Sequence, residues 1–237
     1  MDLGLDGKVA LVTAASKGLG RGAALALARE GARVVICARD PERLKATAAE
    51  LPGEVLAIPA DVTQPDAPQR LVDAAVERFG ALHILVANAG GPPQARALEV
   101  NDDQMLEAVN ANLLTSIRLV QAAVPPMRAA GWGRICLLTS SFVKQPSPTL
   151  SYSNTARTGL WAWAKTAAQD LIDDGITLNL ACPGLHATDR TKELGVEGTM
   201  GDPEDFGAVV AFLCSQPAGF VSGAALQVDG ARTLGLL

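Results

Sequence analysis

The residues best suited to chemistry lie near the start of a long helical segment, from about Leu150 to Leu171. Apolar residues in this segment recur at helical spacing and predict one inward stripe, formed by Leu160, Ala164, Ala167 and Leu171. Continuing the stripe toward the N-terminus places Arg157 and Ser153 on the same face, one turn apart. The only tyrosine of the chain, Tyr152, lies about a quarter-turn away. A hydroxyl beside a guanidinium can supply a proton and stabilise negative charge on a reacting oxygen.

A second group of chemically useful residues follows the first predicted strand. The sequence there reads Thr13-Ala14-Ala15-Ser16-Lys17-Gly18-Leu19-Gly20, and a predicted helix begins within it. Glycines at a strand-to-helix turn let the backbone approach a pyrophosphate, and the helix N-terminus offers N–H groups and a positive dipole. Such a turn is a weak signal alone, but its place after the first strand of an alternating chain strengthens it. The segment predicts a dinucleotide-binding turn.

The end of the second predicted strand indicates which dinucleotide is preferred. NAD-binding proteins place a carboxylate there to hold the ribose hydroxyls, whereas this strand ends at Arg39. The guanidinium of Arg39 is a planar donor suited to a phosphate, and Lys17 adds a second positive charge. Both favour the 2′-phosphate of NADP, so we expect NADPH to be preferred over NADH. Asp40 would soften this preference, and an Arg39 that only projects into solvent is the alternative interpretation.

Apolar strands and longer helical segments alternate along the whole chain. The predicted strands are Lys8–Thr13, Arg33–Ala38, Glu54–Pro59, His83–Ala87, Arg134–Thr139, Ile176–Ala181 and Ala225–Val228. The predicted helices are Gly18–Glu30, Pro41–Leu51, Ala67–Phe79, a stretch of about Asp102–Ala130, Ser151–Ile172 and Pro203–Ser215. Pro125 and Pro126 are expected to kink or end the fourth of these. The alternation predicts one α/β domain over residues 1–237, a parallel sheet of about seven strands with helices on both faces.

Bulk properties exclude several classes of function. The formal net charge is −5 and the pI is about 5.1, which argues against nucleic acid as a partner. No apolar run reaches the roughly 18 residues of a membrane span, and no N-terminal leader is visible. The four cysteines are far apart among apolar neighbours, so they predict free thiols in a reducing cytoplasm and no metal site.

Several motifs together resemble the short-chain dehydrogenase/reductase family, and its 3-oxoacyl-(acyl-carrier-protein) reductases in particular. The Gly-rich turn is similar to the family's TGxxxGxG fingerprint, with Ala14 in place of the first glycine. The other matches, in chain order, are Asp61-Val62, Ala87-Asn88-Ala89-Gly90, Asn112, Ser140-Ser141, Pro183-Gly184, Thr188 and Val228-Asp229-Gly230. His83 replaces an aspartate of the family, and we interpret it as a packing or surface variant. The resemblance covers nearly the whole chain and implies a three-layer Rossmann fold.

The resemblance also implies roles for these residues. Asp61 would hold the adenine, Thr188 would contact the nicotinamide carboxamide, and Asn112 would anchor a water of the proton relay. The residues expected to bind the cofactor are Thr13, Ala15, Ser16, Lys17, Gly18, Leu19, Gly20, Arg39, Asp61, Val62, Asn88, Ala89, Gly90, Arg157, Pro183, Gly184 and Thr188. The candidate catalytic residues are Asn112, Ser140, Ser141, Tyr152, Ser153 and Arg157.

The catalytic frame departs from the family at two positions. In the family, a tyrosine donates a proton to the carbonyl oxygen, and a lysine four residues later lowers its pKa and holds the nicotinamide ribose. The helical register puts Ser153 and Arg157 at these positions. Serine is a far weaker acid than a phenol, and arginine stays protonated. Losing a positioned general acid commonly costs about 10²–10⁴-fold in rate.

Three hypotheses remain open. The chain is an NADP-dependent reductase of a ketone or 3-oxoacyl group that takes its proton from water through Ser140 or Ser141, Ser153 and Asn112. Alternatively, Tyr152 turns into the site and is the acid. In the third hypothesis, the chain binds NADP as a sensor or structural partner without catalysis.

Residues 189–201 predict a short substrate lid over an open cleft. The predicted lining is Gly91–Ala95, Phe142, Val143, Leu150, Leu185 and His186, with His186 as a surface histidine at the cleft mouth. Such a cleft suits a small-molecule or acyl-carrier-bound carbonyl substrate. Trp161 and Trp163 lie off the inward stripe and, with the apolar end Leu234–Leu237, suggest a homodimer or homotetramer.

Overall fold

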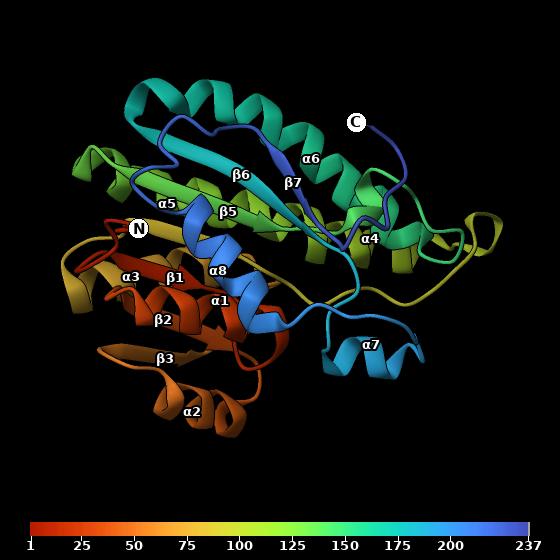
Figure 1. Cartoon of the computed structure of the whole chain (residues 1–237), viewed down its shortest axis with the longest axis horizontal. Helices are drawn as coiled ribbons and strands as arrows, with labels where there is room; N and C mark the ends of the chain where they lie inside the picture. The colour runs from red at the N-terminus through yellow and green to blue at the C-terminus, as the bar shows by residue number, and fades with distance from the viewer. Residues whose placement is uncertain (237) are drawn as a thin grey trace.

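Seven parallel strands form one sheet in the order β3-β2-β1-β4-β5-β6-β7 (Figure 1). This computed structural model describes residues 1–236. The strands are β1 (Val9–Val12), β2 (Arg33–Ala38), β3 (Val55–Pro59), β4 (Ile84–Ala87), β5 (Gly133–Leu138), β6 (Ile176–Pro183) and β7 (Ala225–Val228). The predicted doubly wound α/β fold is confirmed.

Helices cover both faces of the sheet. The α-helices are α1 (Gly18–Arg29), α2 (Pro41–Glu50), α3 (Ala67–Phe79), α4 (Asp102–Val109), α5 (Thr115–Ala130), α6 (Ser151–Leu171), α7 (Asp189–Glu193) and α8 (Pro203–Leu213). Shorter turns of other helical type are η1 (Ala97–Glu99), η2 (Asn110–Leu114), η3 (Ser141–Val143) and η4 (Ile172–Asp174). Helices α1, α2 and α8 pack on one face, and α3, α5 and α6 pack on the other.

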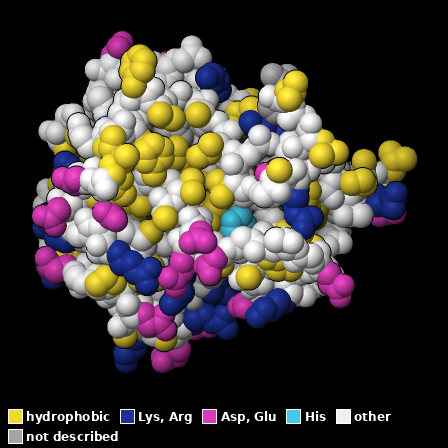
Figure 2. All heavy atoms as spheres, viewed as in Figure 1, with side chains coloured by type: hydrophobic (Ala, Val, Ile, Leu, Met, Phe, Trp, Pro, Cys, Tyr) yellow, Lys and Arg dark blue, Asp and Glu magenta, His cyan; other side chains and the backbone are white. Residues whose placement is uncertain are grey.

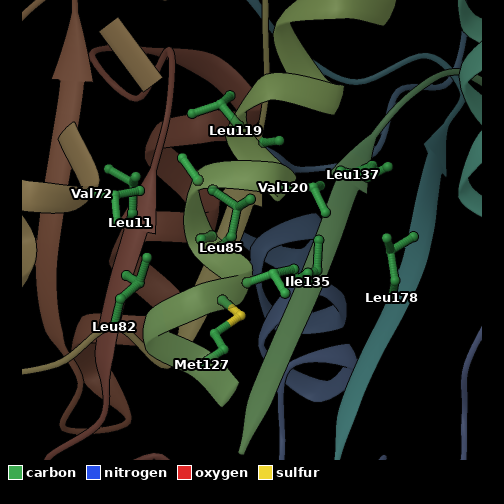
Figure 3. Close-up of a cluster of buried hydrophobic side chains, with 14 of the residues drawn as sticks. Leu11, Val72, Leu82, Leu85, Leu119, Val120, Met127, Ile135, Leu137 and Leu178 are labelled. Atoms are coloured by element: carbon green, nitrogen blue, oxygen red, sulfur yellow. The ribbon is translucent and has the colours of Figure 1, made fainter. Parts of the chain in front are cut away.

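Successive side chains of each strand point to opposite faces of the sheet and pack into two separate cores. On β1, Val9 and Leu11 point toward α3 and α5, whereas Ala10 and Val12 point toward α1 and α8. Figure 3 shows part of the first core, in which strand residues such as Leu85 and Ile135 meet Met127 of α5. Because the central strands are buried on both faces, they are nearly continuous apolar runs.

The strand order reverses between β1 and β4. Chain segments leave these two neighbouring strands in opposite directions, which opens a crevice at their carboxyl ends. The Gly-rich turn follows β1, and Asn88 follows β4. The fold therefore brings these two motifs together at the edge where parallel α/β sheets bind ligands.

The long helical stretch differs from its prediction. Helix α5 continues through Pro125 and Pro126 to Ala130. Pro125 and Gln121, whose carbonyl would otherwise pair with position 125, are both exposed, so water can replace the missing donor. The irregularity falls instead at Asn110–Leu114, a turn of π-helix between α4 and α5. Within residues 1–236, no helix combines the length and apolar character that a membrane span needs.

Candidate active site

The Gly-rich turn is tied to the loop after β4 by Thr13. The Thr13 hydroxyl donates to the Asn88 carbonyl at 2.7 Å and accepts from the Asn88 N–H at 2.8 Å. The Asn88 side-chain amide donates to the Ala14 carbonyl at 3.3 Å. These contacts close one side of the crevice and hold Asn88, Ala89 and Gly90 beside the turn.

Two glycines of the turn are required, Gly20 by a close contact and Gly18 by its left-handed backbone conformation. A Cβ at Gly20 would collide with the Ala14 carbonyl and lie 2.9 Å from the Asn88 amide nitrogen. A Cβ at Gly18 would lie 3.4 Å from the Thr188 methyl group, and its φ is +56°. Ala14 also has a left-handed φ of +48°, so its replacement of a glycine strains the backbone. The turn therefore keeps its geometry at the cost of backbone strain at Ala14.

The first turn of α1 can hold a diphosphate. Lys17 is the N-cap of α1, and no side chain of residues 1–236 caps the helix there. The N-caps of α2, α4 and α8, in contrast, accept hydrogen bonds through Asp40, Asn101 and Asp202. The N–H groups at the start of α1 therefore face the crevice without a side-chain acceptor, which fits a dinucleotide pyrophosphate.

The carboxyl ends of β2 and β3 carry the groups expected at the adenosine end. Asp61 accepts hydrogen bonds from the backbone and hydroxyl of Thr63, at 3.0 and 2.8 Å. The Thr63 N–H holds the pKa of Asp61 below its usual range, with a smaller contribution from Arg39, so this carboxylate is ionised at neutral pH. Asp40 caps α2 through the N–H groups of Glu42 and Arg43.

Helix α6 presents Ser153 and Arg157 on one buried face. Both side chains are 8% exposed. Arg157 Nη1 donates to the carbonyls of Leu138 at 2.9 Å and Thr139 at 3.3 Å, at the end of β5. The next residue, Ser140, accepts from the Phe142 N–H, whereas Ser141 is buried. The structure thus brings Ser153, Arg157 and Ser140 to one corner of the crevice.

Arg157 is a buried cation without a carboxylate partner among residues 1–236. Burial lowers its pKa to about 10, and Arg190 contributes to this lowering. Arg157 therefore remains charged at neutral pH. Burial also raises the pKa of the nearby Cys182 thiol, whose Sγ lies 3.1 Å from the Thr139 hydroxyl, so Cys182 supplies no compensating negative charge.

Tyr152 points toward α4. Its hydroxyl accepts from the Asn101 N–H at 3.0 Å and donates to Gln104 Oε1 at 2.9 Å, and its side chain is fully buried. These two contacts join the start of α4 to α6. The hydroxyl of Tyr152 is therefore engaged outside the corner that holds Ser153.

Asn112 lies in the π-helical turn, with its side chain 2% exposed. Its Nδ2 donates to the Ala108 carbonyl at 3.4 Å, but its Oδ1 is buried and has no partner in the described part of the chain. A buried amide oxygen without a donor is costly unless water satisfies it. Asn112 therefore fits a residue that holds a water next to α6.

The segment after β6 covers the crevice. Thr188 caps α7 and lies beside Gly18. Arg190 donates to the Pro92 carbonyl at 2.8 Å, and Lys17 forms an ion pair with Asp189 at 3.1 Å. The short segment therefore contacts both the Gly-rich turn and the loop after β4, and the open cleft beneath it stays a prediction. At its base, Gly184 lies so close to Asp229 that a Cβ would approach the Asp229 Cα to 2.7 Å.

Two predicted lining residues are buried instead. His186 is 4% exposed, packs edge-to-face on Phe206 with ring centroids 5.1 Å apart, and lies 3.3 Å from the Gly184 carbonyl. The prediction of a surface histidine is therefore wrong, because α8 covers this side of the chain. Val143 is 5% exposed and belongs to the core beneath α6.

Comparison with known proteins agrees with this geometry. The family model described as short chain dehydrogenase matches residues 8–197. The chain belongs to the short-chain dehydrogenase family. Dehydrogenase/reductase SDR family member 4 of Homo sapiens is 32% identical over 243 residues, covering 95% of this chain and 87% of the relative. The 3-oxoacyl-(acyl-carrier-protein) reductase of Vibrio cholerae is 30% identical over 239 residues, covering 96% and 98%.

A solved structure of this short-chain dehydrogenase family has nearly the same fold. L-sorbose reductase from Gluconobacter frateurii, complexed with NADPH and L-sorbose, has a TM-score of 0.91 and 31% sequence identity. The match covers 98% of this chain and 100% of that one. The family assignment makes this chain a member of a group of NAD(P)-dependent oxidoreductases.

Three residues around the site of this short-chain dehydrogenase were not predicted from sequence. They are Arg43, Asp189 and Arg190, which connect α2, α7 and the loop after β4. Arg43 lies four residues after Arg39, so a search for cations on the first turn of α2 could have found it. No local signal pairs Asp189 with Arg43, because they are far apart in the sequence.

Proposed function

We propose that this chain is an NADP-dependent reductase of a ketone or 3-oxoacyl carbonyl, with an atypical proton donor. In this proposal Ser153 and Arg157 occupy the positions of the family's tyrosine and lysine. The observation that carries it is the shared buried face of α6, on which Arg157 reaches the end of β5 beside Ser140. The bound cofactor would supply the hydride.

The proposed residues have separate tasks. Nη1 of Arg157 makes both of its hydrogen bonds to carbonyls within residues 1–236, which leaves Nε and Nη2 to hold ribose hydroxyls. The positive charge of Arg157 also stabilises negative charge that develops on the substrate oxygen. Ser153, whose hydroxyl makes no hydrogen bond to the described chain, would pass a proton from water to that oxygen. Asn112 would hold the water.

The choice of cofactor rests on charge at the adenosine end. In this proposal Lys17 and Arg39 would bind the 2′-phosphate, and it is supported by L-sorbose reductase, a similar structure that is complexed with NADPH. The substrate class is supported by relatives that are named as reductases of 3-oxoacyl groups and of L-sorbose. We propose a small-molecule or acyl-carrier-bound carbonyl compound.

A second candidate function is NADP binding without physiological turnover. It is favoured by the hydrogen bonds of Arg157, which direct Nη1 toward backbone carbonyls rather than toward a substrate. In both cases the cytoplasmic, cofactor-binding protein would be a homodimer or homotetramer. Trp161 and Trp163 are partly buried against the core, and the part of their surface that stays exposed on α6 remains a predicted subunit contact.

Restoring the family pair tests the catalytic proposal. We expect the wild type to oxidise NADPH slowly with ketones or β-ketoacyl thioesters. The Ser153→Tyr/Arg157→Lys double variant should raise kcat by at least about tenfold, because it regains a general acid whose contribution is typically about 10²–10⁴-fold. Arg157→Ala should remove the residual rate of the wild type. The steady-state decrease in NADPH absorbance measures the turnover rate of each variant.

Tyr152→Phe separates this proposal from the alternative acid. We expect unchanged turnover, because the hydroxyl of Tyr152 is engaged by α4. Loss of turnover in Tyr152→Phe would identify Tyr152 as the donor. Tight NADPH binding with no carbonyl turnover in the wild type would instead favour the non-catalytic function.

A further inference from the structure

One carboxylate joins two cations where the first turns of α1, α2 and α7 meet. The same oxygen, Asp189 Oδ2, lies 3.1 Å from Lys17 Nζ and 3.3 Å from Arg43 Nη1. Glu193, one turn later on α7, reaches Lys17 at 4.0 Å. All of these side chains are about half exposed. An anion-binding position between Lys17 and Arg43 is therefore already filled by an anion of the chain itself.

The two cations come from neighbouring strand ends. Lys17 is the N-cap of α1 after β1, and Arg43 lies in the first turn of α2 after β2. Arg39, at the end of β2, has no ion pair within residues 1–236. Figure 2 shows basic and acidic side chains side by side on this part of the surface. A phosphate placed at this edge would meet three cations, two of which are engaged.

The acid belongs to the segment that covers the crevice. Thr188, directly before Asp189, lies beside Gly18, and Arg190, directly after it, holds the Pro92 carbonyl. Asp189 is thus fixed on both sides by contacts of its neighbours. The hydrogen bond from Lys17 holds its pKa below the usual range, so it carries its charge throughout the neutral pH range.

We propose that Asp189 is a specificity-determining residue that competes with the 2′-phosphate of NADP for Lys17 and Arg43. This inference rests on the proposed function, since it concerns binding of the same cofactor. A 2′-phosphate must displace the Asp189 carboxylate or share its cations, whereas NADH, which lacks that phosphate, leaves the ion pairs intact. Asp189 therefore weakens NADPH binding selectively and sets the ratio of NADPH to NADH affinity below what the three cations would otherwise give.

The size of the effect follows from the exposure of the pairs. Half-exposed ion pairs are weak and are screened by salt. Two such pairs predict a change of about three- to tenfold in the dissociation constant at low ionic strength. The change should shrink as salt is added, because both the pairs and the phosphate contacts are screened.

The test compares Asp189→Asn with a matched variant. Asp189→Asn removes the charge while keeping a side chain of the same shape. Glu197→Gln removes one negative charge from the same segment, at an exposed residue that has no ion pair among the described residues. Dissociation constants for NADPH and for NADH are measured by fluorescence titration of each protein at low and at moderate salt.

We expect Asp189→Asn to tighten NADPH binding about three- to tenfold and to leave NADH binding unchanged, while Glu197→Gln changes neither. In an Arg43→Gln background, the gain from Asp189→Asn should be smaller, because one of the contested cations is gone. Equal NADPH affinity in the wild type and Asp189→Asn would overturn the inference and leave the proposed function intact. A wild type that binds neither nucleotide would overturn both.

Discussion

Arg157 shows how a single residue limits the chemistry available to the site. A lysine at its position could exchange protons once its pKa was lowered toward neutrality, but the guanidinium stays charged across the neutral range even though burial lowers its pKa to about 10. Arg157 can therefore position ribose and stabilise charge, but it cannot relay a proton. Any proton that reaches a substrate oxygen must come through a hydroxyl or a water. Proton delivery would therefore depend on the Ser153 hydroxyl and on a water held by Asn112.

His83 gives a prediction about pH and stability. Its Nδ1 accepts a hydrogen bond from the Val9 N–H at 3.0 Å, so protonation at this nitrogen breaks the contact. Burial, with Lys8 and Arg33 nearby, lowers the pKa of His83 below its usual 6.5. A lowered pKa means that the unfolded chain takes up the proton first, so the contribution of His83 is present above about pH 6.5 and is lost as the pH falls.

Urea unfolding between pH 8 and pH 5 measures this contribution. The wild type should lose unfolding free energy more steeply below about pH 6.5 than His83→Asn, by at most about 1.4 kcal/mol per pH unit for one proton. His83→Asn is the control for the wild type, because it retains every other titrating group. Parallel pH profiles for the two proteins would contradict the role given to His83.

At the level of elements, α1 and α8 approach each other more closely than side chains allow. A Cβ at Gly22 would collide with the Pro203 carbonyl, and a Cβ at Gly207 would collide with the Gly22 carbonyl and lie 3.0 Å from the Ala23 nitrogen. Both obstacles are backbone atoms, which cannot rotate away. This contact holds α8, and therefore the base of the covering segment, against the helix that begins at the Gly-rich turn.

Gly207→Ala should therefore destabilise the protein by about 1–3 kcal/mol through overpacking. Gly159→Ala is the matched control on α6, because its Cβ would meet only Leu113 at an ordinary 3.5 Å. That change should be neutral or should stabilise the helix by about 0.5–1 kcal/mol. Chemical denaturation of both variants gives the comparison, and equal effects would show that backbone contact does not distinguish the two glycines.

The elements predictable from sequence are those with local signals. Alternation of apolar strands and helices predicts all seven strands. Burial on both faces makes the central strands continuous apolar runs, whereas β3 and β7 are only partly buried. The π-helical turn at Asn110–Leu114 was not predicted, since one extra residue per turn leaves no mark on composition. The sequence predicts only a short lid where helix α7 forms, because a five-residue helix held by Thr188 and distant ion pairs has too little periodicity.

On the scale of the whole molecule, positions along the chain were easier to predict than contacts between distant segments. Motif order placed the Gly-rich turn and Asn88 at adjacent strand ends, and the structure joins them through Thr13. The ion pairs of Asp189 depend on how β2, α2 and the segment after β6 meet in space. The burial of His186 depends on α8 in the same way. Such contacts follow from the three-dimensional fold, because no spacing rule connects residues so far apart in the sequence.

The surface over α8 and β7 leads to the last prediction. Phe220 is 97% exposed, and Phe212, Val221 and Leu226 are also exposed around it; Figure 2 shows hydrophobic side chains gathered on this face. In the described part of the chain, strand β7 pairs only with β6, so its other edge presents unpaired backbone groups. Of the C-terminal residues, Leu234 and Leu236 are exposed as well, whereas Leu237 lies outside the described residues. This apolar face is a further place where we expect a subunit contact of the proposed homo-oligomer.

Phe220→Lys should lower the molar mass measured by light scattering at micromolar concentration, because it puts a charge into an apolar interface. Leu98→Lys is the matched control, since Leu98 is equally exposed on η1, away from this face. It should leave the mass unchanged. A wild type that is monomeric at micromolar concentration would reject the oligomer, and an unchanged mass in Phe220→Lys would place the contact elsewhere. A stable interface buries about 800 Å² on each partner. A lysine buried in such an interface without a partner would weaken association, so the measured mass distinguishes these outcomes.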